Sequence, residues 1–227
     1  MRRVLAILAA GSATRAGVDK VLADLGGQPV VAWSIAAGVA AGCFEEIVIT
    51  APAERVSAVA VVAADRARVI AGGPTRTASS WRALDVAGGA EIIAIHDAAR
   101  PFVPPSLFAR CVDIAMREGS AVAGLPLADT VRRADEIGVA TEEISREGLW
   151  SVQTPQVFRR ELLARARVAA GDASFSDDAA ALANAGITPR MVLGERRNLK
   201  ITTFEDLAYA RELVDKGLVG FPLAALS

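Results

Sequence analysis

The sequence of 227 residues is poor in the side chains that build metal or disulfide frameworks: it has two cysteines, Cys43 and Cys111, and one histidine. The cysteines match neither a disulfide framework nor a metal-ligand motif, and they indicate a reducing compartment. Positive charge is not in excess, because 25 Lys and Arg residues balance 26 Asp and Glu residues. A net charge of −1 creates no overall field for nucleic acid or anionic membranes. We therefore expect a cytoplasmic protein without a nucleic-acid partner, whose anion sites are local.

Long apolar runs of the membrane-spanning kind are also missing. Residues 25–44 are uncharged, but the 15 residues that follow Pro29 make too short a helix for a hydrocarbon core of about 30 Å. The start, MRRVLAILAAGSA, imitates a secretory signal, yet its apolar run of seven is at the lower limit for one. The same run suits a buried parallel strand, so we predict a strand and no membrane association.

Beyond these absences, the first half of the chain alternates short apolar runs with longer helical stretches. The apolar runs predict strands at 4–9, 46–50, 68–70, 92–95 and 120–125, and the stretches between them predict helices at 30–41, 53–64, 76–86 and 105–117. This alternation is typical of βαβ units, whose right-handed crossovers build a parallel sheet with helices on both faces. We predict an α/β fold with a Rossmann-like, mostly parallel sheet, in a single domain that spans residues 1–227.

The later half of the chain departs from this pattern. Residues 129–135 and 140–146 are polar, β-compatible runs joined by a turn at 136–138, which predicts a projecting β-hairpin arm at 129–146. An exposed hairpin is marginally stable unless something covers it, and a second subunit would do so, which predicts a homodimer. A solvated surface hairpin is the alternative. Further on, the pattern predicts helices at 159–169, 177–184 and 204–216, and strands at 190–193 and 199–202.

A loop of small residues follows the first predicted strand, at the edge where open α/β sheets bind ligands. Its sequence is Ala9-Ala10-Gly11-Ser12, with Arg15 and Lys20 close behind. Small side chains let backbone N–H groups approach an anion, and the two cations add positive charge beside it. The loop has neither the Walker A nor the dinucleotide-binding pattern. It suits nucleotide phosphates, although a simple tight turn has the same composition.

A second glycine-containing loop follows the third predicted strand. Gly72 and Gly73 precede a helix start, and Ser79 lies in its first turns. Free N–H groups at a helix start favour an anion or a nucleobase carbonyl. The alternative is that Thr75 merely caps the helix.

The fourth predicted strand, 92–95, ends in a polar segment. Asp97 emerges there at the ligand edge, facing two basic loops, as a Mg²⁺–nucleotide site requires, and Arg100 can meet a second anion. His96 is expected to be structural with a fixed tautomer, because phosphoryl chemistry needs no base here. The later half adds hydroxyls and cations that suit a polyol phosphate: Thr130, Arg146, Thr154 and Lys200.

With these motifs the sequence resembles the 2-C-methyl-D-erythritol 4-phosphate cytidylyltransferase family of non-mevalonate isoprenoid synthesis. The resemblance covers Val4 to about Leu213. Its specific motifs are His96-Asp97-Ala98-Ala99-Arg100-Pro101, Gly148-Leu149-Trp150 and Gln153-Thr154-Pro155-Gln156. It implies a Mg²⁺-dependent reaction in which CTP and 2-C-methyl-D-erythritol 4-phosphate give 4-diphosphocytidyl-2-C-methyl-D-erythritol and pyrophosphate.

The resemblance also implies roles for individual residues. On the nucleotide side, Arg15 and Lys20 would stabilise the transition state, Asp97 would hold the metal-bound phosphates, and the cytidine would contact Gly72, Ser79 and Ala98. On the substrate side, Arg146 and Lys200 would position the substrate phosphate, with Arg100, Thr130 and Thr154 nearby; Ser176 replaces a threonine of the family and keeps its hydroxyl. In that family the hairpin arm is exchanged between the subunits of a dimer.

The chain departs from the family pattern in the first loop. Leu8 and Ala13 replace a proline and a glycine, and Asp19 replaces the proline before Lys20, where its charge would draw the lysine away from phosphate. Two other functions stay open, of which only the second is supported by these departures. One is a cytidylyltransferase for ribitol 5-phosphate, whose relatives tend to lack the Arg-x-Gly-Leu-Trp stretch, and the other is a weakly active nucleotide-binding relative.

Overall fold

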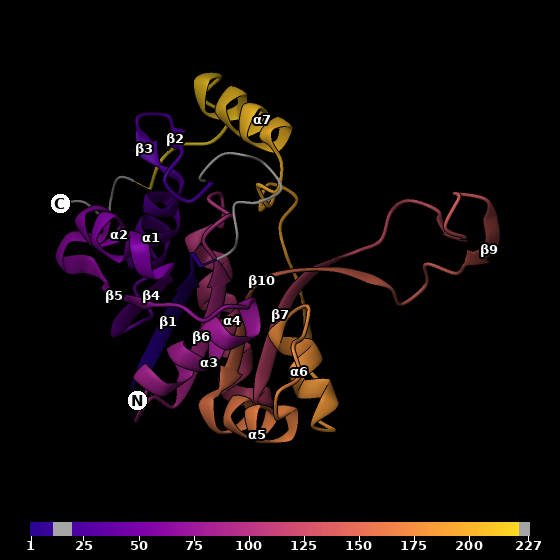
Figure 1. Ribbon diagram of the computed structural model, residues 1–227, viewed down its shortest axis with the longest axis horizontal. Helices are drawn as coiled ribbons and strands as arrows, with labels where there is room; N and C mark the ends of the chain where they lie inside the picture. The colour runs from indigo at the N-terminus through magenta and orange to yellow at the C-terminus, as the bar shows by residue number, and fades with distance from the viewer. Residues whose placement is uncertain (11–19, 223–227) are drawn as a thin grey trace.

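The computed structural model describes residues 1–10 and 20–222, and in this part of the chain seven strands form one central sheet (Figure 1). Across the sheet their order is β11-β7-β10-β6-β1-β4-β5. Their bounds are β1 (Arg3–Leu8), β4 (Glu46–Ala51), β5 (Arg68–Ala71), β6 (Ile92–Asp97), β7 (Ser120–Pro126), β10 (Trp150–Arg159) and β11 (Met191–Leu193). β10 is antiparallel to both its neighbours, and the other neighbouring strands are parallel. The predicted α/β fold with a mostly parallel sheet is confirmed.

Helices cover both faces of the sheet because its strands are apolar on both sides. They are α1 (Val30–Ala40), α2 (Val56–Ala63), α3 (Arg76–Val86), α4 (Pro105–Glu118), α5 (Arg160–Ala170), α6 (Asp178–Asn184) and α7 (Phe204–Asp215), with 3₁₀ turns at Ala53–Arg55 and Ala64–Arg66. Along β1, Leu5 and Ile7 face a core shared with α1, α2 and α4, whereas Val4 and Ala6 face a core shared with α3, α5 and α6. Alternation along a doubly buried strand explains its unbroken apolar sequence. None of the helices in the described ranges has both the length and the apolar character to cross a membrane.

A third apolar cluster holds α7 over the edge where the parallel strands end (Figure 1). Leu207 of α7 belongs to this cluster, which also includes the small hairpin of β2 (Asp24–Leu25) and β3 (Gln28–Pro29). Trp33 of α1 belongs to it too, and its ring meets Phe102 and Phe221 edge to face at 5.4 and 5.0 Å. The segment that precedes α7 is thereby brought close to the loops of the sheet.

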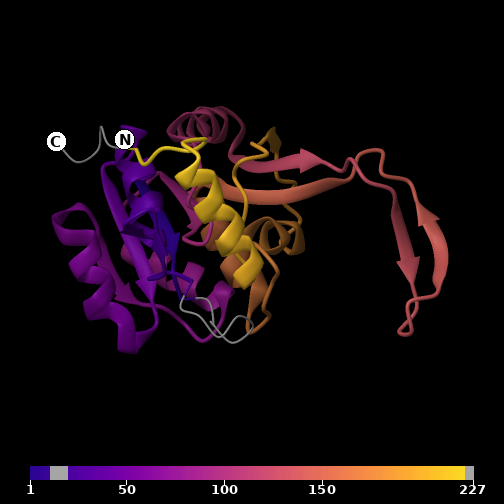
Figure 2. The same ribbon diagram turned by 90° about the horizontal axis from the view of Figure 1, so that it is seen from above.

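The arm consists of β8 (Val131–Ala134) and β9 (Ala140–Ile144), which pair antiparallel and extend away from the sheet (Figure 2). Two ion pairs join the strands, Arg132 with Glu143 at 3.0 Å and Arg133 with Glu142 at 3.2 Å. At the tip, the side chains of Ile137 and Val139 are 87% and 55% exposed. The predicted hairpin is present, and its strands are joined by antiparallel backbone pairing and by these exposed ion pairs.

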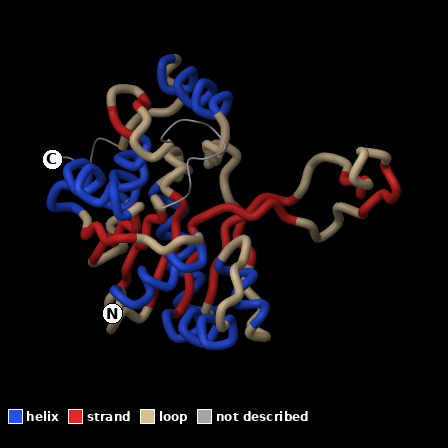
Figure 3. Tube along the Cα trace, viewed as in Figure 1, coloured by secondary structure: helices blue, strands red, loops and turns tan. Residues whose placement is uncertain are grey.

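For the later half, one predicted strand is absent and one strand of the structure was not predicted. Residues 199–202 form no strand (Figure 3). The N–H of Ile201 donates to the Ala99 carbonyl at 2.8 Å, so this segment bonds to a loop and not to a strand ladder. The sequence of β10 does not predict a strand, because Pro155 and three polar neighbours interrupt its apolar pattern. In the structure its pairing with β7 shifts register between Val152 and Gln156, which accommodates that interruption.

Candidate active site

Three loops lie side by side where the parallel strands end. Ala9, Gly72 and Ala98 follow β1, β5 and β6, and their backbone N–H groups donate to carbonyls of a neighbouring strand at 2.8, 2.7 and 3.0 Å. These bonds continue the sheet into its loops and place the three predicted nucleotide residues along one edge. Gly11, Ser12 and Arg15, also predicted to bind the nucleotide, lie outside the described residues, as do Ala13 and Asp19.

The loop before α3 is too tightly packed to hold larger residues. A Cβ on Gly72 would lie 2.4 Å from the Cβ of Ala10, and a Cβ on Gly73 would collide with the first turn of α3. The Ser79 hydroxyl closes the loop, because it donates to the Thr75 carbonyl at 2.9 Å and lies 3.1 Å from the Gly73 N–H that donates to it. Thr75 also caps α3 with its side chain, as the alternative interpretation predicted. Ser79 therefore shapes the loop through its hydroxyl.

Asp97, the last residue of β6, lies between two cations. Its Oδ1 is 3.2 Å from Nε of Arg76, and its Oδ2 is 2.6 Å from Nζ of Lys200. Burial alone would raise the pKa of Asp97, but the charges of Arg76 and Lys200 outweigh it and hold the pKa well below its usual range. Asp97 is therefore ionised at every physiological pH, with one cation on each carboxylate oxygen.

Arg76, at the start of α3, connects Asp97 to a second acid that the sequence analysis misses. Its Nη1 lies 2.7 Å from Oδ2 of Asp178, whose side chain is only 2% exposed at the start of α6. Burial opposes the charge on Arg76, but the two carboxylates outweigh burial and raise its pKa. A positive side chain in the first turn of a helix opposes the helix dipole, so it requires a nearby acid. That unfavourable placement is the signal in the sequence that could have identified Arg76.

His96 takes part in a hydrogen-bonded chain that orients the loop after β6. Its Nε2 lies 3.2 Å from the Arg100 carbonyl, which only accepts, so Nε2 carries the proton. Nδ1 then accepts from the Thr154 hydroxyl at 3.0 Å, and Thr154 Oγ1 accepts from the Asp97 N–H at 3.1 Å. Burial lowers the pKa of His96 to about 4, so the ring is neutral near pH 7. Both ring nitrogens are engaged, which makes His96 a scaffold for Asp97 and Arg100.

Five of the predicted site residues share one cavity of about 260 Å³ with Arg76, namely Asp97, Arg100, Thr154, Ser176 and Lys200. Arg100 is fixed by hydrogen bonds to the Asn198 and Val152 carbonyls at 2.8 and 3.3 Å. A larger cavity, of about 430 Å³, lies beside Met1 and Glu91 at the opposite end of the strands. We favour the smaller cavity because open α/β sheets bind ligands at the carboxyl ends of their strands.

Lys20 contacts the short segment before α7 that carries Lys200. The Lys20 ammonium donates to the carbonyl of Thr202, two residues after Lys200. The Asp206 carboxylate accepts from the N–H groups of Thr202 and Thr203 at 2.7 and 2.9 Å, within a capping box at the start of α7. The segment is thus fastened to α7, and its Lys200 side chain donates a hydrogen bond to Asp97.

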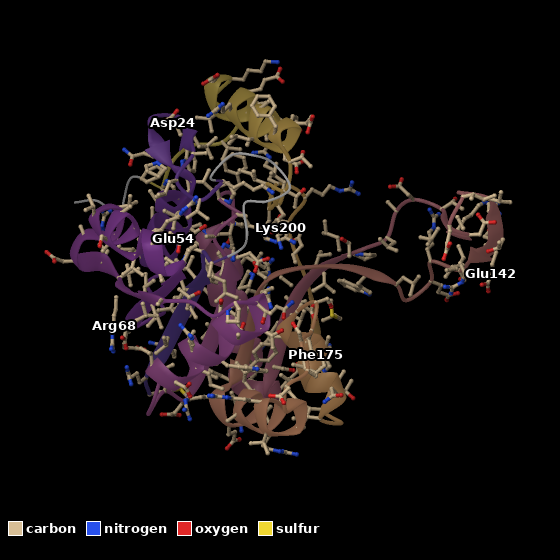
Figure 4. The ribbon with its side chains drawn as sticks, in the orientation of Figure 1. Asp24, Glu54, Arg68, Glu142, Phe175 and Lys200 are labelled. Atoms are coloured by element: carbon tan, nitrogen blue, oxygen red, sulfur yellow. The ribbon has the colours of Figure 1, made fainter. Side chains whose placement is uncertain are left out.

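Arg146 and Thr130 lie apart from this cavity. They line a separate hollow with Glu143, Ile144 and Ser145 where the arm leaves the body. The Arg146 guanidinium donates to the Ala128 carbonyl in the other strand connection of the arm. Figure 4 shows Lys200 over the sheet, whereas Glu142 lies far out on the arm. A single chain therefore does not bring the predicted pair, Arg146 and Lys200, into one cavity.

Comparison with known proteins identifies the class of protein to which this chain belongs. The model of the family described as "IspD: 2-C-methyl-D-erythritol 4-phosphate cytidylyltransferase" matches residues 4–216. A protein of that name from Deinococcus radiodurans is 43% identical over 215 residues, which cover 93% of this chain and 89% of the relative. A bifunctional enzyme IspD/IspF from an Anaeromyxobacter species is 42% identical over 94% of this chain, which spans only 58% of that relative's length. The chain is an α/β nucleotidyltransferase.

Solved structures agree with this class. The cytidylyltransferase of the same name from Thermus thermophilus superposes with a TM-score of 0.77 at 32% identity, over 95% of this chain and all of that one. The bifunctional IspDF of Campylobacter jejuni gives a TM-score of 0.79 at 28% identity, over 92% of this chain and 54% of that one. The chain belongs to the 2-C-methyl-D-erythritol 4-phosphate cytidylyltransferase family.

Proposed function

We propose that this protein transfers the cytidylyl group of CTP to 2-C-methyl-D-erythritol 4-phosphate and releases pyrophosphate, in isoprenoid precursor synthesis. One observation is the main support for placing this reaction in the cavity. The ionised Asp97 lies at the ligand edge and lines the same cavity as Arg100 and Lys200. The nucleotide loops at Ala9 and Gly72 lie along the same edge. Family membership supports the identity of both substrates.

The chemistry requires positioning and charge neutralisation rather than a base. An oxygen of the substrate phosphate forms a bond to the α-phosphorus of CTP while the bond from that phosphorus to the bridging oxygen breaks, and pyrophosphate leaves. The attacking group is already an anion, so no proton has to be removed, which agrees with a His96 whose two nitrogens are engaged. Arg100 and Lys200 reduce the repulsion between two anions, and a fixed geometry supplies the in-line approach.

The residues present fit a magnesium ion that is held mainly by nucleotide phosphates. Mg²⁺ in such sites takes one or two carboxylates, and phosphate oxygens and waters complete its octahedron. In the described ranges no group of three acidic, His or Cys side chains could hold an ion by itself, which agrees with an ion held mainly by phosphates. We assign Asp97 as its protein ligand, because Asp97 ends β6 at the ligand edge and lines the cavity. Its two oxygens each retain a lone pair beside Arg76 and Lys200. When bound, Mg²⁺ would neutralise and orient the triphosphate.

The same proposal includes a homodimer that completes the site. The arm exposes apolar side chains at its tip and carries Arg146 and Thr130 in a hollow outside the Asp97 cavity. In a two-fold dimer each arm can extend to the partner, so Arg146 of one chain would meet Lys200 of the other. This arrangement would reconcile the separation of the two cations in one chain with the joint role on one phosphate that the family resemblance implies.

The proposal is tested by pyrophosphate release from four nucleoside triphosphates, each combined with 2-C-methyl-D-erythritol 4-phosphate or ribitol 5-phosphate, with and without Mg²⁺. We expect release only with CTP, 2-C-methyl-D-erythritol 4-phosphate and Mg²⁺. The loss of a key electrostatic contact costs about 10²–10³ in rate, so Lys200→Met should lose most activity. Lys216→Met, which removes an exposed lysine paired with Glu212 on α7, is the matched control. Equal turnover with ribitol 5-phosphate, or none with any pair, would refute the assignment.

A further inference from the structure

Two buried carboxylates face the guanidinium of Arg76, a residue that lines the cavity. Asp97 ends β6 and Asp178 begins α6, and their side chains are 10% and 2% exposed. Arg76 lies between them, with Nε toward Asp97 at 3.2 Å and Nη1 toward Asp178 at 2.7 Å. If Arg76 were removed, the two acids would lose the countercharge that they share. Burying two carboxylates without it would lower the stability of the folded state.

The two ends of this bridge are held rigidly. At one end, Thr75 caps α3 directly before Arg76, so the arginine backbone is fixed. At the other end, the Gln156 side-chain carbonyl accepts from the N–H groups of Asp178 and Ala179 at 3.1 and 3.0 Å, which fastens α6 to β10. Arg76 thus transmits the position of a well-anchored helix to the carboxylate of Asp97.

The orientation of Asp97 depends on this contact. Arg76 occupies Oδ1 and Lys200 occupies Oδ2, so the plane of the carboxylate is set from both sides. A guanidinium can bridge two acids with separate nitrogens in a fixed fork, whereas a lysine ammonium is a single point of charge. Among the ion pairs of residues 1–10 and 20–222, Arg76 is the one of the two cations on Asp97 that also pairs with an acid on another element.

We infer that Arg76 is a positioning residue for Asp97 in the transfer reaction. Its ion pair with Asp178 on α6 fixes the guanidinium, and the guanidinium in turn orients the Asp97 carboxylate. This inference rests on the proposed function, because Asp97 must take part in catalysis. A purely structural link between α3 and α6 would not need charge, since apolar residues of similar volume often stabilise a protein as well as a buried ion pair does. Moreover, Nη2 of Arg76 is buried without a hydrogen-bond partner in the described ranges, a cost that packing alone would not require.

The experiment is a kinetic double-mutant cycle with Arg76→Met, Asp97→Asn and the double variant. Residues that orient a functional ligand contribute about 10- to 100-fold, so Arg76→Met should lower kcat by that factor and change KM for CTP much less. In the Asp97→Asn background the further loss should be under about threefold, because the group that Arg76 positions is already gone. Arg167→Met, which removes an arginine paired with Asp85 outside the cavity, is the matched control and should keep wild-type kcat.

Additive losses in the cycle would overturn the inference, because Arg76 would then act independently of Asp97. If Arg76→Met does not fold, Arg76→Lys provides the test: it keeps a charge but cannot bridge both acids, so kcat should fall while the thermal midpoint stays within a few degrees. Wild-type kcat in a folded Arg76→Lys protein would also overturn it. Absence of activity in the unmodified enzyme would instead refute the proposed function, which separates the two failures.

Discussion

Subunit mixing would show whether each active site draws on two chains. One variant, Lys200→Met, damages the cavity that contains Asp97, and the other, Arg146→Ala, damages the arm. The two side chains line different cavities in one chain, so each substitution leaves the other residue's surroundings intact. Each variant alone should have low activity with a normal thermal midpoint, because Lys200 is 40% exposed and the Arg146 side chain lies at the exposed base of the arm.

The expected recovery follows from the symmetry of a two-fold dimer. Random exchange of equal amounts makes about half of the dimers mixed. In a mixed dimer with shared sites, one site combines Lys200 with Arg146 from the partner and is intact, while the other site has both defects. About half of the dimers are mixed, and each of these has one intact site out of two, so the mixture should show about a quarter of wild-type activity. If Arg146 serves its own chain, every site keeps one defect and activity stays at the level of the separate variants.

The assay is pyrophosphate release with CTP and 2-C-methyl-D-erythritol 4-phosphate, before and after exchange. Native mass spectrometry of two differently tagged variants must first show that mixed dimers have formed. A mixture of Lys216→Met with Arg146→Ala should retain about half of wild-type activity both before and after exchange, because only Arg146 is defective in that pair. No recovery in a verified mixture of Lys200→Met and Arg146→Ala would refute the shared site.

Three further predictions concern Asp97, Lys20 and His96. Asp97→Asn should lower kcat by a factor of about 10²–10³ while circular dichroism shows a folded protein. Near-normal turnover would show that Asp97 is not part of the active site. Lys20→Met should lower kcat more than it raises KM for CTP in steady-state kinetics; an effect on KM alone would make Lys20 a ground-state contact. The pKa of His96 falls from 6.5 unfolded to about 4 folded, so below pH 6.5 the unfolded chain binds more protons and stability drops as pH falls. In urea unfolding, the wild type should lose about 2 kcal/mol more than His96→Gln between pH 7 and 5, and parallel losses would contradict a neutral buried His96.

Local patterns in the sequence were sufficient for most of the architecture. Doubly buried strands such as β1 and β6 are unbroken apolar runs, and helices such as α4 begin at a proline and end at a glycine, so each element is specified within a short window. The position of Asp97 also followed from sequence, because a polar residue directly after a buried parallel strand must emerge at the ligand edge.

The contacts that assemble the site depend on tertiary structure. β10 is a strand despite Pro155 because β6 and β7 supply hydrogen-bond partners on both sides, and residues 199–202 are not a strand because the loop after β6 satisfies Ile201 instead. Arg76 and Asp178 are 102 positions apart, and no local pattern pairs them. Buried charges are tolerated only where an opposite charge meets them in space, and the folded chain alone decides where that is.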